Sequence, residues 1–239
     1  FYLNWIVDPW QYPTSVAQFG FVYHPFYAIF DGNVVILRLS NILFTVGLAL
    51  YLVSSVQRES LKRSLAASES IVSLPIAVTA MTLFFGGVFT PSYNSLVVQG
   101  VMIAAIGVVR SSGNTCFSSI AIGLGGTLVF LAKPSSAVLL AIVVPVIVWR
   151  IGKQPARTLL FAAFTSTVCM AIAMLYISGG AEEFLMRMRA GYEATIALHP
   201  RYGFWEVIRI DSPLFNLGET VSFALLVAFS ITCVIFTRY

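Results

Sequence analysis

Charged residues are scarce in this chain, and their scarcity excludes most soluble folds. Asp, Glu, Lys and Arg make up 10% of the 239 residues, whereas soluble domains average about 25%. Hydrophobic residues make up 58%, and the mean hydropathy is +0.88. A soluble domain of this size cannot bury so much apolar surface, but a lipid bilayer can cover it. The composition therefore predicts a single membrane-embedded unit.

Cysteine and histidine are also rare, which argues against disulfide bonds and metal centres. Cys116, Cys169 and Cys233 lie in or beside apolar runs without CxxC spacing, a pattern typical of buried free thiols. Two histidines cannot form a convincing transition-metal site, and there is no P-loop or GxGxxG motif. We therefore expect no cofactor, although a loop carboxylate could help to hold a divalent cation.

Long apolar runs are what the sequence does contain, and they predict an all-α, polytopic transmembrane helical bundle. Seven runs are candidate spans: Val34–Ser55, Ile71–Phe89, Ser95–Val109, Phe117–Ala132, Ser136–Trp149, Thr158–Ile177 and Val221–Phe236. A full crossing needs roughly 17–25 residues. The third and fifth runs are shorter, so they must include flanking residues or cross a thinned bilayer.

Lys and Arg are concentrated in every second loop, which places them on one side of the predicted spans. One set of loops is basic and contains Arg58, Lys62, Arg63, Arg110, Arg150, Lys153, Arg157 and Arg238. The opposite short loops are nearly free of Lys and Arg, with Lys133 as their one basic residue. The positive-inside rule places the basic set in the cytoplasm. The net charge of +4 thus reports topology and does not indicate nucleic-acid binding.

Two longer segments lie on the predicted extracytoplasmic side. Residues 1–32 are rich in aromatic side chains, which favour the headgroup level of a bilayer, so we expect interfacial helices there. Residues 178–220 begin with a predicted amphipathic helix over Glu182–Ala190. The chain then divides into the end of a first extracytoplasmic loop (1–32), six spans (33–177), a second such loop (178–220) and a truncated last span (221–239).

Four short stretches on the predicted outer side carry a resemblance to a known superfamily. They are Tyr12-Pro-Thr-Ser15 with Gln18-Phe-Gly-Phe21 and His24-Pro25, then Arg38-Leu-Ser-Asn41, Thr90-Pro-Ser-Tyr-Asn94 and Lys133-Pro-Ser-Ser136. In order and topology they resemble the GT-C superfamily of integral-membrane glycosyltransferases. The greatest similarity is to bacterial relatives of the dolichyl-phosphate-mannose–protein mannosyltransferases and of the lipid A aminoarabinose transferase. The resemblance covers most of the chain.

This resemblance implies transfer of a sugar from a polyprenyl-phosphate donor to an acceptor on the extracytoplasmic face of a bacterial inner (plasma) membrane. It also implies a catalytic carboxylate in the first outer loop, often as Asp-Glu just before an aromatic stretch. The first five residues, Phe1–Trp5, look like the residues just after such a pair, so we expect the catalytic Asp upstream of Phe1. Asp8 is the other candidate, although Asp8-Pro9 is more simply typical of a turn.

Basic residues on the outer side are the candidates for binding the donor phosphate. Lys133 adjoins the outward start of the helix predicted from Ser136, which Ser135 or Ser136 can cap, and helix N-termini attract anions. Lys133 could instead simply extend to lipid headgroups. The helix predicted from Ser95 also starts on this side. Arg38 lies near the outer end of its span, where pairing with Asp31 or Asp8 is an equally natural role.

Five further residues complete the predicted substrate site. His24 could bind sugar or phosphate, or only fix its loop. His199 and Arg201 lie in the second outer loop, and arginine is well suited to phosphate. Tyr93 and Asn94 could line the mouth of the cavity or cap a helix. Two rival functions remain open, a secondary transporter and a non-catalytic membrane scaffold, although the near absence of charge from the predicted midplanes favours a surface-acting enzyme.

The alternation of Lys and Arg generates the first prediction, which concerns topology. Residues 1–32, 90–94 and 178–220 should lie on one side of the membrane, and residues 56–70, 110–116 and 150–157 on the other. Cysteines introduced at Ser92 and Ser112 should therefore react with an impermeant thiol reagent from opposite sides. Labelling of both from the same side would reject this topology.

Overall fold

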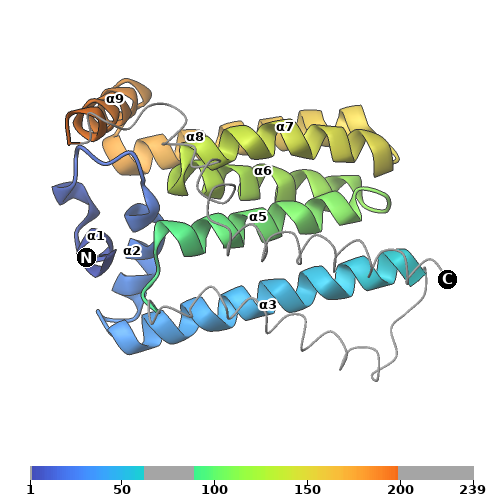
Figure 1. Cartoon of the computed structure of the whole chain (residues 1–239), viewed down its shortest axis with the longest axis horizontal. Helices are drawn as coiled ribbons and strands as arrows, with labels where there is room; N and C mark the ends of the chain where they lie inside the picture. The colour runs from blue at the N-terminus through green and yellow to red at the C-terminus, as the bar shows by residue number, and fades with distance from the viewer. Residues whose placement is uncertain (1, 62–88, 199–239) are drawn as a thin grey trace, which may run out of the picture. The chain divides into compact units, whose positions relative to one another are not determined.

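The computed structural model describes residues 2–61 and 89–198 (Figure 1). The predicted spans Ile71–Phe89 and Val221–Phe236 lie outside the described residues, except for Phe89, and so do His199 and Arg201. The contacts divide the chain into two units, Phe1–Tyr192 and Glu193–Tyr239. The account that follows concerns the first unit.

The described residues form helices joined by short turns, with no strand among them. The helices are α1 (Tyr2–Val7), the 3-10 helix η1 (Pro9–Gln11), α2 (Phe19–Ile29), α3 (Val34–Leu61), α5 (Tyr93–Arg110), α6 (Thr115–Ala132), α7 (Pro134–Ile151), α8 (Pro155–Ser178) and α9 (Ala181–Leu198). Five of them, α3 and α5–α8, are long and apolar enough to cross a membrane. The all-α membrane fold is thus confirmed, with five candidate spans in the described residues.

Local sequence chemistry sets where these helices begin and end. The short third and fifth runs are extended by flanking residues into helices of 18 residues each, α5 and α7. Pro134 and Pro155 occupy first turns, where a missing N–H costs nothing. Asn114 caps α6 by accepting from the amide of Phe117. Gly179 ends α8 in the left-handed conformation, with φ of 78°.

Helix α6 is the central element, and glycine lets it approach its neighbours closely. A Cβ atom on Gly125 would lie 2.5 Å from the carbonyl oxygen of Gly100 in α5, and one on Gly100 would lie 2.9 Å from that of Gly125. On another side of α6, a Cβ on Gly123 would lie 2.5 Å from the carbonyl oxygen of Ala162 in α8. Small residues are how membrane helices gain van der Waals contact without a hydrophobic driving force.

The remaining spans expose their apolar side chains. About half of the apolar windows of α5 and α6 are buried, 50% and 56%, against 22% for α3 and 11% each for α7 and α8. Exposed side chains on those three helices are large and aliphatic or aromatic, such as Leu43, Ile142 and Phe164. In a bilayer these faces would meet lipid.

This exposure corrects one prediction about cysteine. Cys116 and Cys169 are free thiols, as predicted, but neither is buried inside the protein. Cys169 is half-exposed because it lies on α8, whose apolar window is mostly exposed, and Cys116 is exposed in the first turn of α6. Cys233 lies outside the described residues.

The two ends of the bundle differ in chemistry. Residues 2–33, which we call the N-terminal layer, pack where α3 and α5 begin and where α6 and α8 end, through apolar clusters that include Ile6, Phe19, Leu96, Leu131 and Ile177 (Figure 1). We call this end the layered end. The opposite end, the basic end, carries Arg58, Arg110, Arg150, Lys153 and Arg157.

Contacts across the basic end tie its helices together. Arg110 donates to the Tyr51 hydroxyl over 3.2 Å, Ser112 donates to Glu59, and the amide of Lys153 donates to the carbonyl of Ser111. The two sets of loops that differ in Lys and Arg content therefore lie at opposite ends of the helices. Ser92 is buried whereas Asn94 is exposed, so a cysteine at Asn94 is the more accessible reporter for the layered end.

The glycine contact generates a prediction about stability that has a control one residue away. Gly125→Ala should lower the free energy of unfolding by about 1–3 kcal/mol, because its methyl group would meet backbone atoms of α5. Gly126→Ala should be neutral or slightly stabilising, since nothing lies within 4 Å of its Cβ position. Unfolding of both variants in lipid bicelles tests this, and equal stability of the two would show that α5 and α6 separate without cost.

Candidate functional site at the layered end

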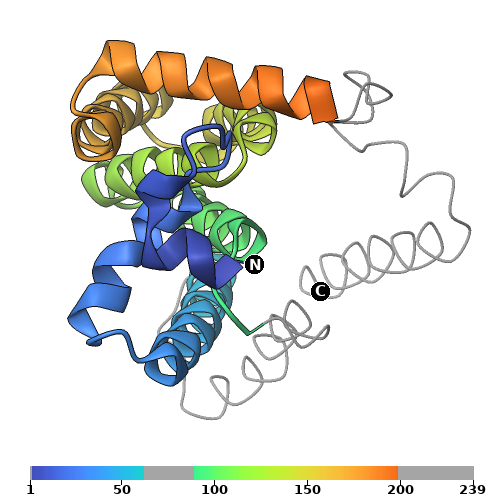
Figure 2. The same ribbon diagram turned by 90° about the vertical axis from the view of Figure 1, so that its left-hand side faces the viewer.

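The layered end brings together segments that are far apart in the sequence. The backbone amide of Gln18 donates to the backbone carbonyl of Leu131, at the end of α6, over 2.6 Å. Helix α9 runs across the same end rather than along the spans (Figure 2). Arg187 of α9 donates through Nη2 to the carbonyls of Pro9 and Tyr12, over 3.0 and 2.8 Å. The N-terminal layer therefore contacts both the ends of the spans and α9.

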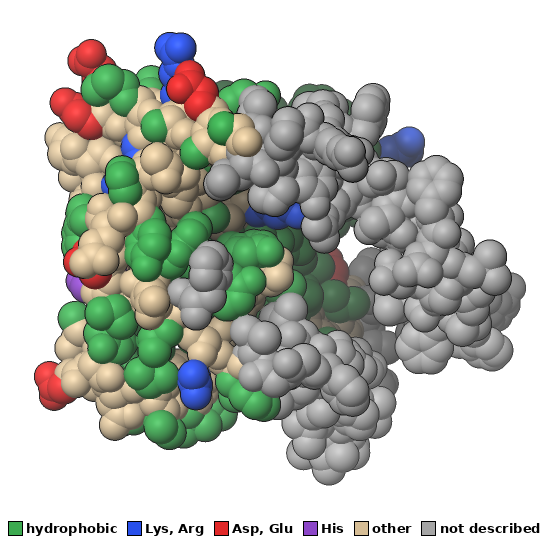
Figure 3. Space-filling model, turned by 60° about the vertical axis from the view of Figure 1, so that its left-hand side comes forward, with side chains coloured by type: hydrophobic (Ala, Val, Ile, Leu, Met, Phe, Trp, Pro, Cys, Tyr) green, Lys and Arg blue, Asp and Glu red, His purple; other side chains and the backbone are tan. Residues whose placement is uncertain are grey.

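Aromatic side chains form much of the N-terminal layer. Phe19 is fully buried and stacks on Trp5 with ring centres 5.5 Å apart, and Trp5 stacks on Tyr12 at 5.0 Å. Tyr93 at the start of α5 meets the rings of Tyr2 and Phe19 edge-on. Figure 3 shows hydrophobic side chains spread over this face, with charged ones scattered around them. Tyr93 is therefore a packing residue here, whereas Asn94 is exposed.

A buried polar network joins the N-terminal layer to two spans. The Tyr23 hydroxyl of α2 donates to Oε1 of Gln99 in α5 over 2.8 Å. Nε2 of Gln99 donates to Oδ1 of Asn41 and to Oγ1 of Thr45, both in α3 and both over 2.9 Å. All four side chains are buried, and burial raises the pKa of the Tyr23 phenol, so it stays a neutral donor. The network fixes α2 against α3 and α5.

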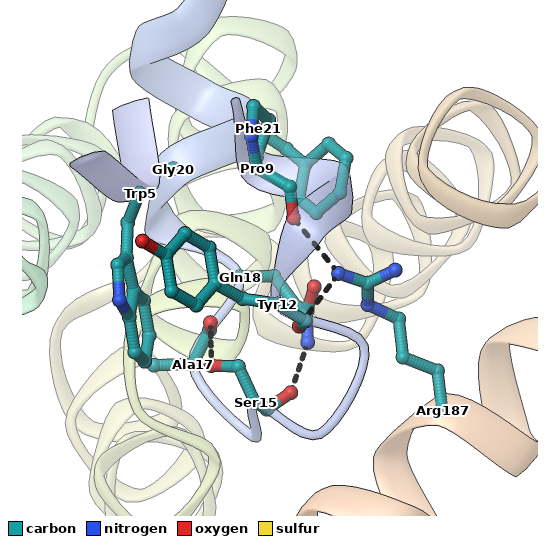
Figure 4. A pocket seen from close by; sticks show the side chains of 9 residues that line it. All are labelled: Trp5, Pro9, Tyr12, Ser15, Ala17, Gln18, Gly20, Phe21 and Arg187. Atoms are coloured by element: carbon teal, nitrogen blue, oxygen red, sulfur yellow. Dashed lines mark hydrogen bonds between the residues drawn. The ribbon is translucent and has the colours of Figure 1, made fainter. Parts of the chain in front are cut away.

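A small, partly open pocket lies beneath α9 (Figure 4). Its free space is about 10 Å³, enough for roughly one water molecule. The lining residues are Trp5, Pro9, Tyr12, Ser15, Ala17, Gln18, Gly20, Phe21 and Arg187. In the view of Figure 4 the side-chain amide of Gln18 and the guanidinium of Arg187 face each other. The pocket joins the first Tyr-Pro-Thr-Ser stretch of the sequence to the start of the second outer segment.

Arg187 is the residue of this site that the sequence did not reveal. Its guanidinium lies 5.0 Å from the centre of the Phe21 ring, and burial lowers its pKa. No carboxylate accepts a hydrogen bond from it within the described residues, and its buried Nε has no partner there. The missed signal was the spacing of Phe184, Arg187 and Gly191, which places an arginine on the inner face of a helix.

Lys133 lies at the layered end, but the helix beside it differs from the one predicted. Helix α7 starts at Pro134, so Lys133 itself is the N-cap residue, and neither Ser135 nor Ser136 caps the helix. The carbonyl of Lys133 instead accepts from the amides of Ser136 and Ala137. The side chain of Lys133 is half-exposed and its amine has no hydrogen-bond partner among the described residues. It remains available to an anion.

The start of α5 lies two residues before the predicted start near Ser95 and carries a capping box. The helix begins at Tyr93, and Ser92 and Ser95 cap each other reciprocally. Both serines are buried, and the hydroxyl of Ser95 also lies 3.4 Å from that of Tyr23. The capping box satisfies the amides of Ser92 and Ser95 within the protein.

Arg38 and Asn41 both contact the segment that precedes α5. Nε of Arg38 donates to Oγ1 of Thr90 over 3.0 Å, and Nδ2 of Asn41 donates to the carbonyl of Phe89 over 3.5 Å. The predicted alternative partners of Arg38, Asp31 and Asp8, are thus not the ones that it bonds. Arg38 is exposed, so its guanidinium lies at the surface of the layered end.

His24 and Asp8 lie in adjoining parts of the N-terminal layer. Nδ1 of His24 lies 2.8 Å from the carbonyl of Ile6, which can only accept, so Nδ1 carries a proton and donates it to this carbonyl. The ring also meets Trp10 edge-on at 5.1 Å. Asp8 precedes the turn of η1, as the Asp-Pro pair predicts, and its side chain makes no capping hydrogen bond.

Comparison with protein families, with curated proteins and with solved structures finds no match to this chain. Within residues 2–61 and 89–198, no group of three His, Cys, Asp or Glu side chains could hold a metal ion. The function must therefore be argued from the chemistry of the layered end itself.

The buried network generates a prediction about its coupling. Gln99→Leu should destabilise the protein by roughly 1–3 kcal/mol for each buried polar group that loses its partner. Tyr23→Phe removes one hydroxyl and should cost less. In a double-mutant cycle of these substitutions, we expect a coupling energy of about 0.6–1.7 kcal/mol. A coupling of zero in bicelle unfolding would show that the two side chains do not interact.

Proposed function

We propose that the protein is an integral-membrane glycosyltransferase of the GT-C type. It would move a sugar from a polyprenyl-phosphate donor to an acceptor at the extracytoplasmic face of a bacterial inner (plasma) membrane. One observation carries this proposal. The candidate polar and cationic side chains gather at the layered end, whereas no buried position in the described residues holds a charged side chain.

That distribution of charge favours a surface-acting enzyme over a transporter. Transporters place ionisable groups and broken helices near the bilayer midplane. The described spans instead contain serine and threonine whose hydroxyls donate to backbone carbonyls one turn earlier, as Ser119 does to Thr115 and Thr127 to Gly123. These contacts serve helix packing. They provide no path for a charged solute through the described spans.

The orientation of the layered end follows from the basic end. If the basic end is cytoplasmic, the N-terminal layer and α9 lie at the outer surface, at the depth of lipid headgroups. Trp10 and Tyr176 are 45% and 44% exposed and pack edge-on against each other there. Exposed aromatic rings are typical of that depth. This supports the expectation of interfacial helices, since α9 crosses the end of the bundle (Figure 2).

Each candidate side chain has a role in this chemistry. A base must remove a proton from the acceptor hydroxyl or amine. The expected base is a carboxylate upstream of Phe1; Asp8, or Nε2 of His24, are the candidates within the described residues. A cation must stabilise the departing lipid phosphate. Lys133 suits this role because its amine is free of protein partners in the described residues.

The proposal predicts the effect of removing the Lys133 charge. Lys133→Met keeps the apolar stem and loses the amine, so it should cost roughly 1.5–3 kcal/mol, or about a 10- to 150-fold loss of transfer. If the amine acts mainly in the transition state, the loss falls on turnover rather than on donor affinity. The assay uses the full-length protein and a polyprenyl-phosphate sugar.

The matched control is Lys153→Met at the basic end, where Lys153 is exposed. That variant should retain normal transfer. Near-normal transfer by Lys133→Met would assign Lys133 to lipid headgroups alone, and Arg38 or Arg201 would be tested next. If the folded full-length protein transfers no sugar from any polyprenyl-phosphate donor, the glycosyltransferase proposal itself fails.

A further inference from the structure

Helix α9 is joined to α8 by two glycines that little else restrains. Gly179 has φ of 78°, a conformation that glycine adopts without steric cost. Nothing lies within 4 Å of a Cβ position on Gly179, and only the flexible side chain of Glu183 lies near that of Gly180. The two glycines themselves therefore pack against little, and the direction of α9 is set by the buried contact of Phe184 with Ile177, Leu131 and Phe21.

The contacts of α9 with the N-terminal layer and the spans come from one narrow face. Among the side chains of α9 that the structure describes, Phe184 is the one large side chain that is fully buried, and it joins Phe21, Leu131 and Ile177. One turn further, Met188 places its sulfur 3.9 Å from Nε2 of Gln18. Gly191 lies directly on the backbone of residues 15 and 16. Leu185, Met186 and Tyr192 are all exposed on the other sides of the helix.

Two polar side chains at the contact between α9 and the N-terminal layer, Arg187 and Gln18, are only partly hydrogen-bonded in this structure. Arg187 donates through Nη2 to two carbonyls, but its Nε is buried without a partner among the described residues. Gln18 is 2% exposed, and its Oε1 is likewise buried without a partner. A buried donor or acceptor without a partner favours any state in which water reaches it. Lifting α9 would hydrate both atoms.

We propose that α9 is a lid, hinged at Gly179–Gly180 and fastened by Arg187, over the pocket formed by residues 5–21. The contacts that hold the closed state include the buried ring of Phe184, the two hydrogen bonds of Arg187 to backbone carbonyls, and the contacts of Met188 and Gly191. It is opposed by two unpaired polar atoms. The partly open pocket has room for roughly one water molecule, and Arg187 is the residue of α9 in its lining. Raising α9 would withdraw that side chain and make room for a larger ligand. The lid does not depend on which reaction the layered end performs.

Thiol labelling can measure how often this lid opens. Ser15 lines the pocket and is 7% exposed, so Ser15→Cys is a reporter that should react faster when α9 is raised. The three native cysteines are first replaced by serine. The full-length protein in lipid nanodiscs is then exposed to an impermeant maleimide. Arg187→Met should raise the labelling rate at least about 10- to 150-fold, because it removes two charge-assisted hydrogen bonds and that factor is expected for the loss of one.

A second variant opens the lid by steric means and has a matched control. Gly191→Ala should also speed labelling, because its methyl group would lie 2.8 Å from backbone atoms of Ser15 and Val16. Gly126→Ala should leave the rate unchanged, since its methyl group meets nothing. A cysteine at Ser118, buried in α6 far from α9 in the sequence, should label slowly in every variant.

Two results would overturn the proposal. Unchanged labelling of Ser15→Cys in both Arg187→Met and Gly191→Ala would show that α9 does not cover the pocket as a lid. An equal rise at Ser15→Cys and Ser118→Cys would show that the whole bundle loosens and that no separate hinge exists. Because labelling requires no substrate, the outcome is independent of the sugar-transfer assay.

Discussion

The close contact of α5 with α6 is the constraint on which the layered end depends. Gly100 and Gly125 let two backbones meet where any Cβ atom would collide with a carbonyl. Because no hydrophobic force drives helices together in lipid, this contact area must supply the attraction. It fixes the end of α6, whose Leu131 carbonyl holds Gln18, and the start of α5, whose Ser95 and Gln99 hold Tyr23. The N-terminal layer is thus positioned by a pair of glycines within the bundle.

Polar groups at the layered end fall into two states that have opposite consequences. In the network of Tyr23, Gln99, Asn41 and Thr45 every strong donor has an acceptor at hydrogen-bond distance, and such a network rigidifies its surroundings. In the pocket beneath α9, Arg187 and Gln18 each keep one buried atom without a partner among the described residues. The first arrangement fixes α2 to the spans, and the second leaves α9 weakly held. A rigid base with a movable cover is a common design for sites that must exclude water during a reaction.

The sequence predicted the parts of this structure that depend on one-dimensional patterns. Apolar runs located the five described spans, and Lys and Arg distinguished the basic end from the layered end, because hydropathy and loop charge are local properties. Helix α7 starts at Pro134, two residues before the predicted start at Ser136, because proline is favourable in a first helical turn and Lys133 occupies the N-cap position. Arg187 and Gln99 could not be ranked above other polar residues, since their importance lies in partners 175 and 76 positions away.

The contrast between a rigid N-terminal layer and a separately attached α9 matters for the chemistry proposed at the layered end. A lipid-linked donor arrives from the bilayer and an acceptor arrives from water, so the reaction requires a place that both can reach and that can then exclude water. Lys133 stands at the end of the spans, with its amine free among the described residues, whereas His24 is oriented by the carbonyl of Ile6 within the N-terminal layer. Both belong to the rigid part of the end. Helix α9 is the one described element there whose attachment combines unpacked glycines with unpaired polar atoms. A motion of α9 would therefore change access to the pocket without moving either candidate residue.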